Sequence, residues 1–108
     1  VISMVPSWTE TLLLAGVEVV GRTRFCIHPQ DRVQNIPVVG GTKDIDWDLV
    51  YSLHADLIIF DREENLLEMS EECLIPQLVT HVKDLPSLQS EFEKLGDTFK
   101  NAQLIEWA

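Results

Sequence analysis

The sequence predicts an α/β fold, a mostly parallel sheet with helices on both faces. Short apolar runs rich in β-branched residues alternate along the chain with segments of helical periodicity. The run at 57–60 is apolar on both of its alternating sides, as in strands covered on both faces. Polar loops at 21–29, 40–43 and 61–65 each follow an apolar run. Because parallel sheets bind ligands beyond the carboxyl ends of their strands, we expect these three loops to form one rim.

The first segments predict a strand, a tight turn and a helix. Residues 1–5 form a β-prone run that Pro6 stops. Ser7 stands three residues before Glu10, which is the pattern of a capping box, so we expect the helix to begin at Ser7. Gly16 supplies the left-handed position that ends it. The residues that share its apolar face are Trp8, Leu12 and Ala15.

Two further strands and a capped helix follow. Residues 17–20 predict a strand that leads into the first loop, and 36–39 predict a strand that Pro37 places at or near an edge. Asp46 is the expected N-cap of the next helix, and its flanking acids, Asp44 and Asp48, suit the positive end of the helix dipole. The buried stripe of that helix is expected to be Leu49, Val50 and Leu53.

The second half repeats the alternation. The run at 57–60 predicts a central strand, and 77–82 predicts another. An amphipathic helix is expected within 63–73, with Leu66, Leu67 and Met69 as its apolar residues. A last long helix should begin at Ser87, weakened by Gly96, and 102–108 predicts a further helix. The residues on the apolar face of the long helix are Leu88, Phe92, Leu95 and Phe99.

Composition limits the function classes. A chain of 108 residues with 45% hydrophobic residues suffices for one small domain with a core. A net charge of −10 argues against nonspecific binding to nucleic acid or to acidic membranes. We expect the two cysteines, Cys26 and Cys73, to be free thiols rather than a bridge. Four of the eight basic residues nevertheless fall near the first two loops and predict a local patch for a small anionic ligand: Arg22, Arg24, Arg32 and Lys43.

Several local patterns leave alternatives open. Cys26 and His28 could be half of a metal site, could pack the loop, or could contact an organic or chelated ligand. The 40–43 loop lacks the residue order of a nucleotide phosphate loop. It is either a flexible lead into a capped helix, or it offers backbone N–H groups and Lys43 to an anionic ligand. Glu63 and Glu64 could provide a functional acid, or could simply favour the dipole of the following helix. No enzyme signature emerges.

Taken together, residues 5–12, 20–26, 38–43 and 55–59 resemble the N-terminal lobe of class III substrate-binding proteins, which serve iron-siderophore, haem and cobalamin ABC importers. The resemblance covers nearly the whole chain. It implies a Rossmann-like lobe of a two-lobe protein joined by a helical backbone. Residues 1–101 would be the N-terminal ligand-binding lobe, and 102–108 the start of the interlobe helix, with the second lobe absent. Val1 is not a methionine, so we expect a processed or excised piece of a longer protein.

The resemblance also implies site residues. Transporter docking would use Asp48, and neither catalytic residues, nor a metal held by the protein itself, nor a resident cofactor is implied. Cobalamin binders carry a large aromatic residue near Thr42, so Thr42 favours other metal chelates. The implied ligand contacts are Ser7, Trp8, Arg24, Phe25, Cys26, Gly41, Thr42, Lys43, Arg62 and Glu63.

The functional hypothesis is therefore a non-enzymatic, periplasmic or otherwise extracytoplasmic binding protein. Its partners would be a small-molecule metal chelate (an iron-siderophore, haem or a cobalamin-like corrinoid) and the permease of an ABC importer, with no nucleic acid involved. Two alternatives remain at this point. One is a small α/β enzyme or regulator with Cys26 as a reactive thiol. The other is a cytoplasmic ligand sensor built on the same lobe.

Overall fold

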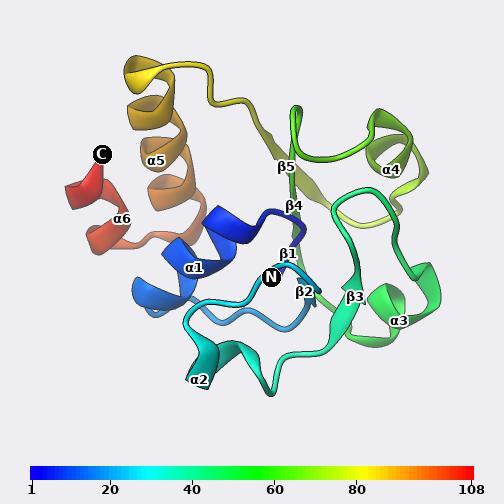
Figure 1. Cartoon of the computed structure of the whole chain (residues 1–108). Coiled ribbons are helices and arrows are strands. Elements are labelled where there is room, and N and C mark those ends of the chain that lie inside the picture. The colour runs from blue at the N-terminus through cyan, green and yellow to red at the C-terminus, as the bar shows by residue number, and fades with distance from the viewer.

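A parallel sheet with the strand order β1-β4-β5 forms the centre of the fold, and β2 pairs with β3 beside it (Figure 1). The computed structural model describes all 108 residues. None of the helices has the length and apolar character needed to cross a lipid bilayer. In chain order the elements are β1 (Ile2–Ser3), α1 (Pro6–Leu14), β2 (Arg22–Thr23), α2 (Gln30–Val33), β3 (Val38–Gly40), α3 (Trp47–Ser52), β4 (Ile58–Asp61), α4 (Leu67–Glu72), β5 (Gln77–Thr80), α5 (Leu85–Phe99) and α6 (Ala102–Trp107).

The two sheets are joined along β1. The Ser3 N–H donates to the Gly21 carbonyl at 3.1 Å, and the Val20 N–H donates to the Val1 carbonyl at 2.8 Å. Every pairing between named strands is parallel. The central place predicted for the 57–60 run is confirmed, since β4 lies between β1 and β5 and is buried throughout. The carboxyl ends of the strands therefore share one edge, from which the loops after them emerge.

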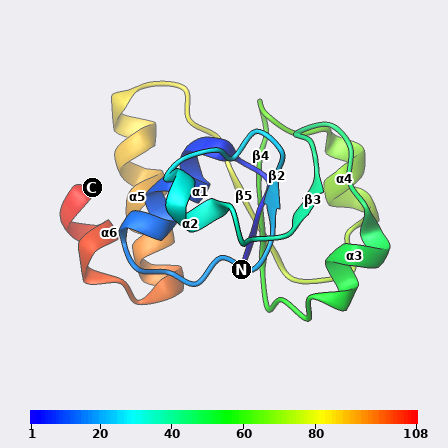
Figure 2. The same ribbon diagram turned by 60° about the horizontal axis from the view of Figure 1, so that its bottom comes forward.

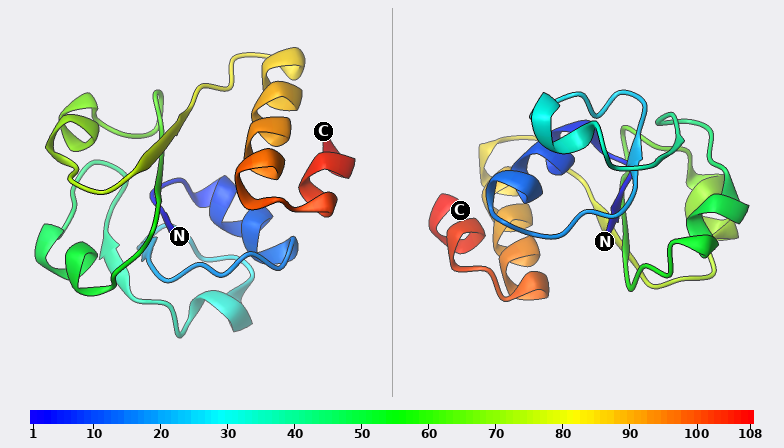
Figure 3. Two further views of the ribbon diagram at one scale, coloured as in Figure 1. Left: turned by 180° about the vertical axis from the view of Figure 1, so that it is seen from behind. Right: turned by 90° about the horizontal axis from the view of Figure 1, so that it is seen from below.

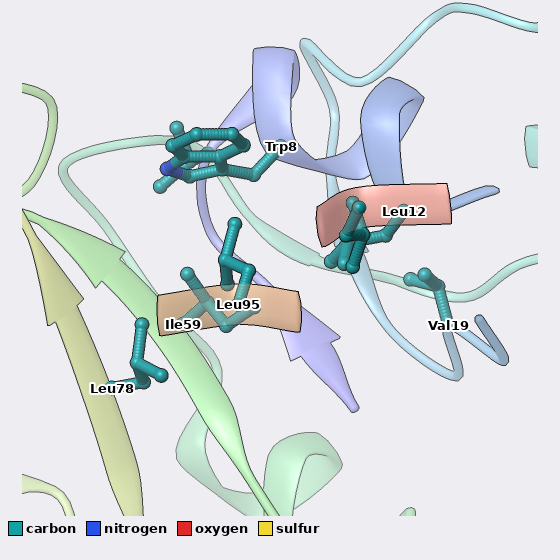
Figure 4. Close-up of a cluster of buried hydrophobic side chains, with 8 residues drawn as sticks. Trp8, Leu12, Val19, Ile59, Leu78 and Leu95 are labelled. Atoms are coloured by element: carbon teal, nitrogen blue, oxygen red, sulfur yellow. The ribbon is translucent and has the colours of Figure 1, made fainter. Parts of the chain in front are cut away.

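Helices cover both faces of the sheet, as predicted (Figures 1 and 2). On one face α1, α5 and α6 pack over one core cluster, and on the other face α3 and α4 pack over a second. The first cluster, part of which Figure 4 shows, consists of Val5, Trp8, Leu12, Val19, Ile59, Leu78, Leu95 and Leu104. The second consists of Ile2, Met4, Val39, Val50, Ile58, Phe60 and Met69.

Alternation along β4 explains the two cores. Ile59 faces the first cluster, whereas Ile58 and Phe60 face the second, because successive side chains of a strand point to opposite sides. Burying an aliphatic or aromatic side chain of this size contributes about 1.5–3 kcal/mol. The run that is apolar on both sides therefore holds the two helical layers together.

Some local predictions hold and others are corrected. Asp46 caps α3 as expected, accepting from the Leu49 N–H at 3.2 Å, and Gly16 has the left-handed φ of 80°. The capping box at Ser7 is wrong: α1 begins at Pro6 after Val5, without a side-chain cap. Proline suits the first helical position because its φ is already helical and its missing N–H is not needed there.

The strand predicted at 17–20 is also wrong. Its residues lie outside the named strands, and the ladder with β3 starts later, at Arg22. The helix expected within 63–73 shortens to α4, and its predicted apolar residues Leu66 and Leu67 are exposed, Leu67 to 70%. The reason is that residues 62–66 fold as a loop around Asp61.

A turn between the last two helices brings α6 back along α5 (Figure 3). The long helix begins earlier than the expected Ser87, because Asp84 and Ser87 form its capping box. Lys100 takes the left-handed conformation after α5, and Asn101 caps α6 by accepting from the Leu104 N–H at 3.0 Å. Gly96 is buried, and a Cβ there would lie 2.5 Å from Ile105 Cγ1 and 3.1 Å from its backbone nitrogen. This glycine therefore allows the two helices to approach closely.

We predict that Gly96→Ala destabilises the protein by about 1–3 kcal/mol, because overpacking against Ile105 outweighs the helix-propensity gain of about 1 kcal/mol. Urea unfolding measures this difference. The control is Gln89→Ala, an exposed position of the same helix where α6 does not approach. A Gly96→Ala protein more stable than wild type would show that the close helix contact is wrong.

Candidate functional site

The loops after β1, β3 and β4 converge on the side chain of Asn65. Its Nδ2 donates to the Met4 carbonyl at 3.0 Å and to the Thr42 carbonyl at 2.8 Å, and its Oδ1 accepts from the Asp61 N–H at 2.8 Å. Asn65 is buried, so water cannot satisfy these polar groups and they depend on the hydrogen bonds of the amide. Two of the three loops predicted to share a rim, 40–43 and 61–65, are therefore joined by this amide, together with the loop after β1.

A second buried network ties α1 and β5 to the same rim. Trp8 Nε1 donates to Thr80 Oγ1 at 2.9 Å, and Thr80 Oγ1 donates to Asp61 Oδ1 at 2.7 Å. The other oxygen of Asp61 accepts from the backbone N–H groups of Glu63 and Glu64 at 3.0 and 3.3 Å. Asp61 thus serves as an acceptor for neutral donors, and it fixes the shape of the 61–65 loop.

Arg24 and Asp44 join the loop after β2 to the loop after β3. Nη1 and Nη2 of Arg24 donate to Oδ1 and Oδ2 of Asp44 at 3.1 and 2.9 Å. The Gly41 N–H also donates to Asp44 Oδ1, at 3.1 Å. The hydrogen bond from Arg24 lowers the pKa of Asp44 and raises that of Arg24. The pairing is bidentate, the geometry in which guanidinium and carboxylate fit best.

Gly41 leaves the space that this ion pair occupies. A Cβ at position 41 would lie 2.1 Å from Arg24 Nη1 and 2.5 Å from Asp44 Oδ1. Any other residue here would push the guanidinium away. The Arg24 N–H, in turn, donates to the Gly40 carbonyl at 2.8 Å, which holds the two loops side by side.

An apolar platform stands beside the ion pair. Phe25 is 55% exposed, and the guanidinium carbon of Arg24 lies 5.7 Å from the centroid of its ring. An exposed aromatic ring covered on one side by a guanidinium offers its remaining surface to a flat apolar ligand.

A cavity of about 320 Å³ lies beside the rim, between the start of α1, the 61–65 loop and α5. Its walls combine apolar and polar groups. The residues that line it are Val5, Ser7, Trp8, Thr11, Asp61, Glu63, Glu64, Val82, Leu88 and Phe92. His81 Nε2 lies 2.8 Å from Glu63 Oε1 and donates to this carboxylate when the ring carries its proton on Nε2. The site therefore includes a pocket next to an exposed platform.

The structure separates the predicted contact residues into two groups. The exposed or half-buried ones at the rim are Ser7, Arg24, Phe25, Thr42, Lys43, Arg62 and Glu63. Cys26 is a correction, because it is buried; Trp8 is also buried in the core, but it lines the cavity beside the rim. Gly41 is buried too, and its N–H is occupied by Asp44 rather than offered to a ligand. Asp48 is exposed in the first turn of α3.

Cys26 is the clearest correction. Its side chain is 1% exposed, and its sulfur lies 3.1 Å from Thr9 Oγ1 and 3.2 Å from Thr23 Oγ1. Of the three interpretations of the Cys26 and His28 pair, loop packing fits, because the thiol faces inward while His28 is exposed. A substrate could not reach this thiol, so the thiol-enzyme alternative loses its basis. Both cysteines are free, as expected.

The predicted basic patch is also corrected. Arg22 donates to the backbone carbonyls of Ile36 and Cys26 at 3.0 Å each, and Arg32 donates to the Leu13 carbonyl at 2.7 Å. Arg24 is paired with Asp44. Only Lys43 of the four has no hydrogen bond or ion pair. Nor do His, Cys, Asp and Glu side chains gather in groups of three or more that could hold a metal ion.

Sequence reasoning missed Asp44, Asp61, Asn65 and Thr80 as organising residues. Asp44 was assigned to the helix dipole, and the other three carry no spacing that reveals which distant loop each will meet. The only available signal was the position of Asp61 and Asn65 in a loop that follows the most buried strand.

Neither a protein-family model nor a curated protein matches this sequence. Solved structures do. A periplasmic heme binding protein from Pseudomonas aeruginosa is 28% identical, with a TM-score of 0.83, over 97% of this chain and 39% of that one. The periplasmic vitamin B12 binding protein BtuF of Vibrio cholerae is 22% identical, with a TM-score of 0.75, over 89% and 39%. Staphylococcus aureus IsdE complexed with heme is 17% identical, with a TM-score of 0.81, over 95% and 41%.

These matches confirm the fold inferred from the resemblance. The chain folds as a single lobe of the class III periplasmic binding proteins and spans about two fifths of the length of the solved structures it matches.

We predict that Asn65→Asp destabilises the protein by about 2–4 kcal/mol, because two buried carbonyls lose their donor and face a carboxylate instead. Urea unfolding gives the difference, and amide exchange shows whether the loops at 40–43 and 61–65 open first. The matched control is Asn35→Asp, the same change at an exposed position. Equal stabilities of the two variants would contradict the role assigned to Asn65.

A second prediction concerns pH. Arg24 lowers the pKa of Asp44 below its usual 3.8. The ion pair therefore contributes its full stabilisation at pH values above the pKa of Asp44 in the unfolded chain, where the carboxylate is ionised in both states. The stability difference between wild type and Asp44→Asn should be constant above about pH 5 and should vanish as pH falls through the lowered pKa. Unfolding curves between about pH 2 and 7 test this. A difference that does not change with pH would mean that the pair contributes nothing.

Proposed function

We propose that this chain is the N-terminal ligand-binding lobe of the substrate-binding component of an ABC importer, which captures a metal chelate. The observation that carries the proposal is the rim: the exposed Phe25 platform, with charged and polar side chains beside it, at the carboxyl edge of a parallel sheet. Ligands of parallel α/β sheets bind at that edge. The similar folds described above belong to proteins that bind heme or vitamin B12.

The chemistry of the rim favours a flat and partly apolar ligand. Phe25 offers apolar surface, and Lys43 and Arg62 are exposed cations on the loops after β3 and β4. An iron-siderophore, haem or a cobalamin-like corrinoid combines such surfaces. Thr42 is too small to pack on a corrin ring as an aromatic residue would, which counts against cobalamin itself.

The proposal also includes a second lobe, because this chain spans about two fifths of the similar proteins. A second lobe would close over the rim, with residues 1–101 forming the first lobe and α6 in 102–108 beginning the connection between them. A permease would dock on the outside of the lobe, where the exposed Asp48 on α3 offers a carboxylate. Such a protein works outside the cytoplasm and catalyses no reaction.

Binding to the full-length protein that contains this lobe tests the proposal. Calorimetric titration with hemin, cyanocobalamin and ferrioxamine B should show binding of at least one, and Phe25→Ala should weaken it by about 1–3 kcal/mol without unfolding the lobe. The control is Leu74→Ala, which removes an apolar side chain that is 83% exposed and lies before β5, at the opposite edge of the sheet. Silence with all three chelates would overturn the ligand class. Unchanged binding by Phe25→Ala would overturn the placement of the site.

A further inference from the structure

We propose that Asp44 determines the specificity of this site by occupying the guanidinium fork of Arg24 and so disfavouring chelates that carry free carboxylates. The inference rests on the proposed function. It assigns to Asp44 a role that only the folded structure suggests, since twenty positions separate the two residues in the chain.

The geometry shows that the fork is occupied. One hydrogen bond from each terminal nitrogen of Arg24 reaches a different oxygen of Asp44, which is how a ligand carboxylate would also bind. The Gly41 N–H holds Asp44 from the other side, so the carboxylate is in place before a ligand arrives. A ligand carboxylate would therefore compete with a group of the same chemistry.

The pair is nevertheless accessible. The side chains of Arg24 and Asp44 are 50% and 61% exposed, and Arg24 borders the Phe25 ring. Exposed ion pairs contribute little to stability, so a ligand or a substitution can open this one without unfolding the lobe. Asp44 thus affects the choice of ligand more than the stability of the lobe.

No other cation at the rim compensates strongly for this occupancy. Arg22 and Arg32 donate to backbone carbonyls elsewhere, Lys43 offers a single ammonium rather than a bidentate fork, and Arg62 precedes the exposed carboxylates of Glu63 and Glu64 in its own loop. The chain as a whole carries −10. An anionic chelate therefore meets a repulsive element, and a site gains specificity from such elements as much as from attractive contacts.

The experiment compares three probes in the full-length protein: hemin, with two carboxylates, cyanocobalamin, which is neutral, and the iron complex of ferrioxamine B, which is cationic. Asp44→Asn keeps an acceptor for the Gly41 N–H but frees the charge of Arg24. We expect it to raise the affinity for hemin by about 3- to 10-fold, with changes below about 2-fold for the other two. The matched control is Asp56→Asn, which removes the same charge at an exposed position before β4, at the other edge of the sheet.

Arg24→Gln added to Asp44→Asn should remove the gain, because the gain depends on a free guanidinium. A hemin affinity that stays unchanged or falls in Asp44→Asn, or a gain equal to that of Asp56→Asn, would overturn the inference while the proposed function stands. Failure of wild type and variants to bind any of the three probes would overturn the proposed function and the inference with it.

Discussion

The shape of the rim depends on the hydrogen bonds of Asn65. Strands alone place the carboxyl ends of β1, β3 and β4 at one edge, but the loops beyond them carry polar backbone groups that need partners. Asn65 satisfies one such group from each of the three loops. An amide is suited to this because it has two N–H donors and an acceptor oxygen, whereas a carboxylate has no donor and a hydroxyl has only one.

The basic residues that lie close together in the chain do not form one basic patch at the rim. Cations that cluster in the sequence are separated in space, because arginines readily donate to several backbone carbonyls and so cap loops. Of the arginines clustered at 22–32, only Arg24 remains at the rim, and Asp44 neutralises it. What remains exposed is a mixed surface of apolar and singly charged groups. A flat chelate with both kinds of edge suits such a surface better than a compact polyanion does.

The sequence predicted the features that depend on local periodicity. Alternation of strands and helices, the central β4, the Asp46 cap and the apolar face of α5 were all predictable because neighbours in the chain determine them. The direction in which Cys26 faces was not, since Thr9 and Thr23 approach it from a helix and a strand. The exposed leucines of 66–67 show the same limit: helical spacing predicts a stripe, but the loop around Asp61 decides whether the helix has begun.

The close approach at Gly41 links two positions that are far apart in the chain. A methyl group there would occupy the space of the Arg24 guanidinium, so position 41 cannot gain a side chain while the guanidinium stays where it is. Natural variants of this lobe that carry a side chain at position 41 should therefore lack the arginine at 24 or place its guanidinium elsewhere. A comparison of related sequences at positions 24 and 41 would reveal this dependence without any purified protein.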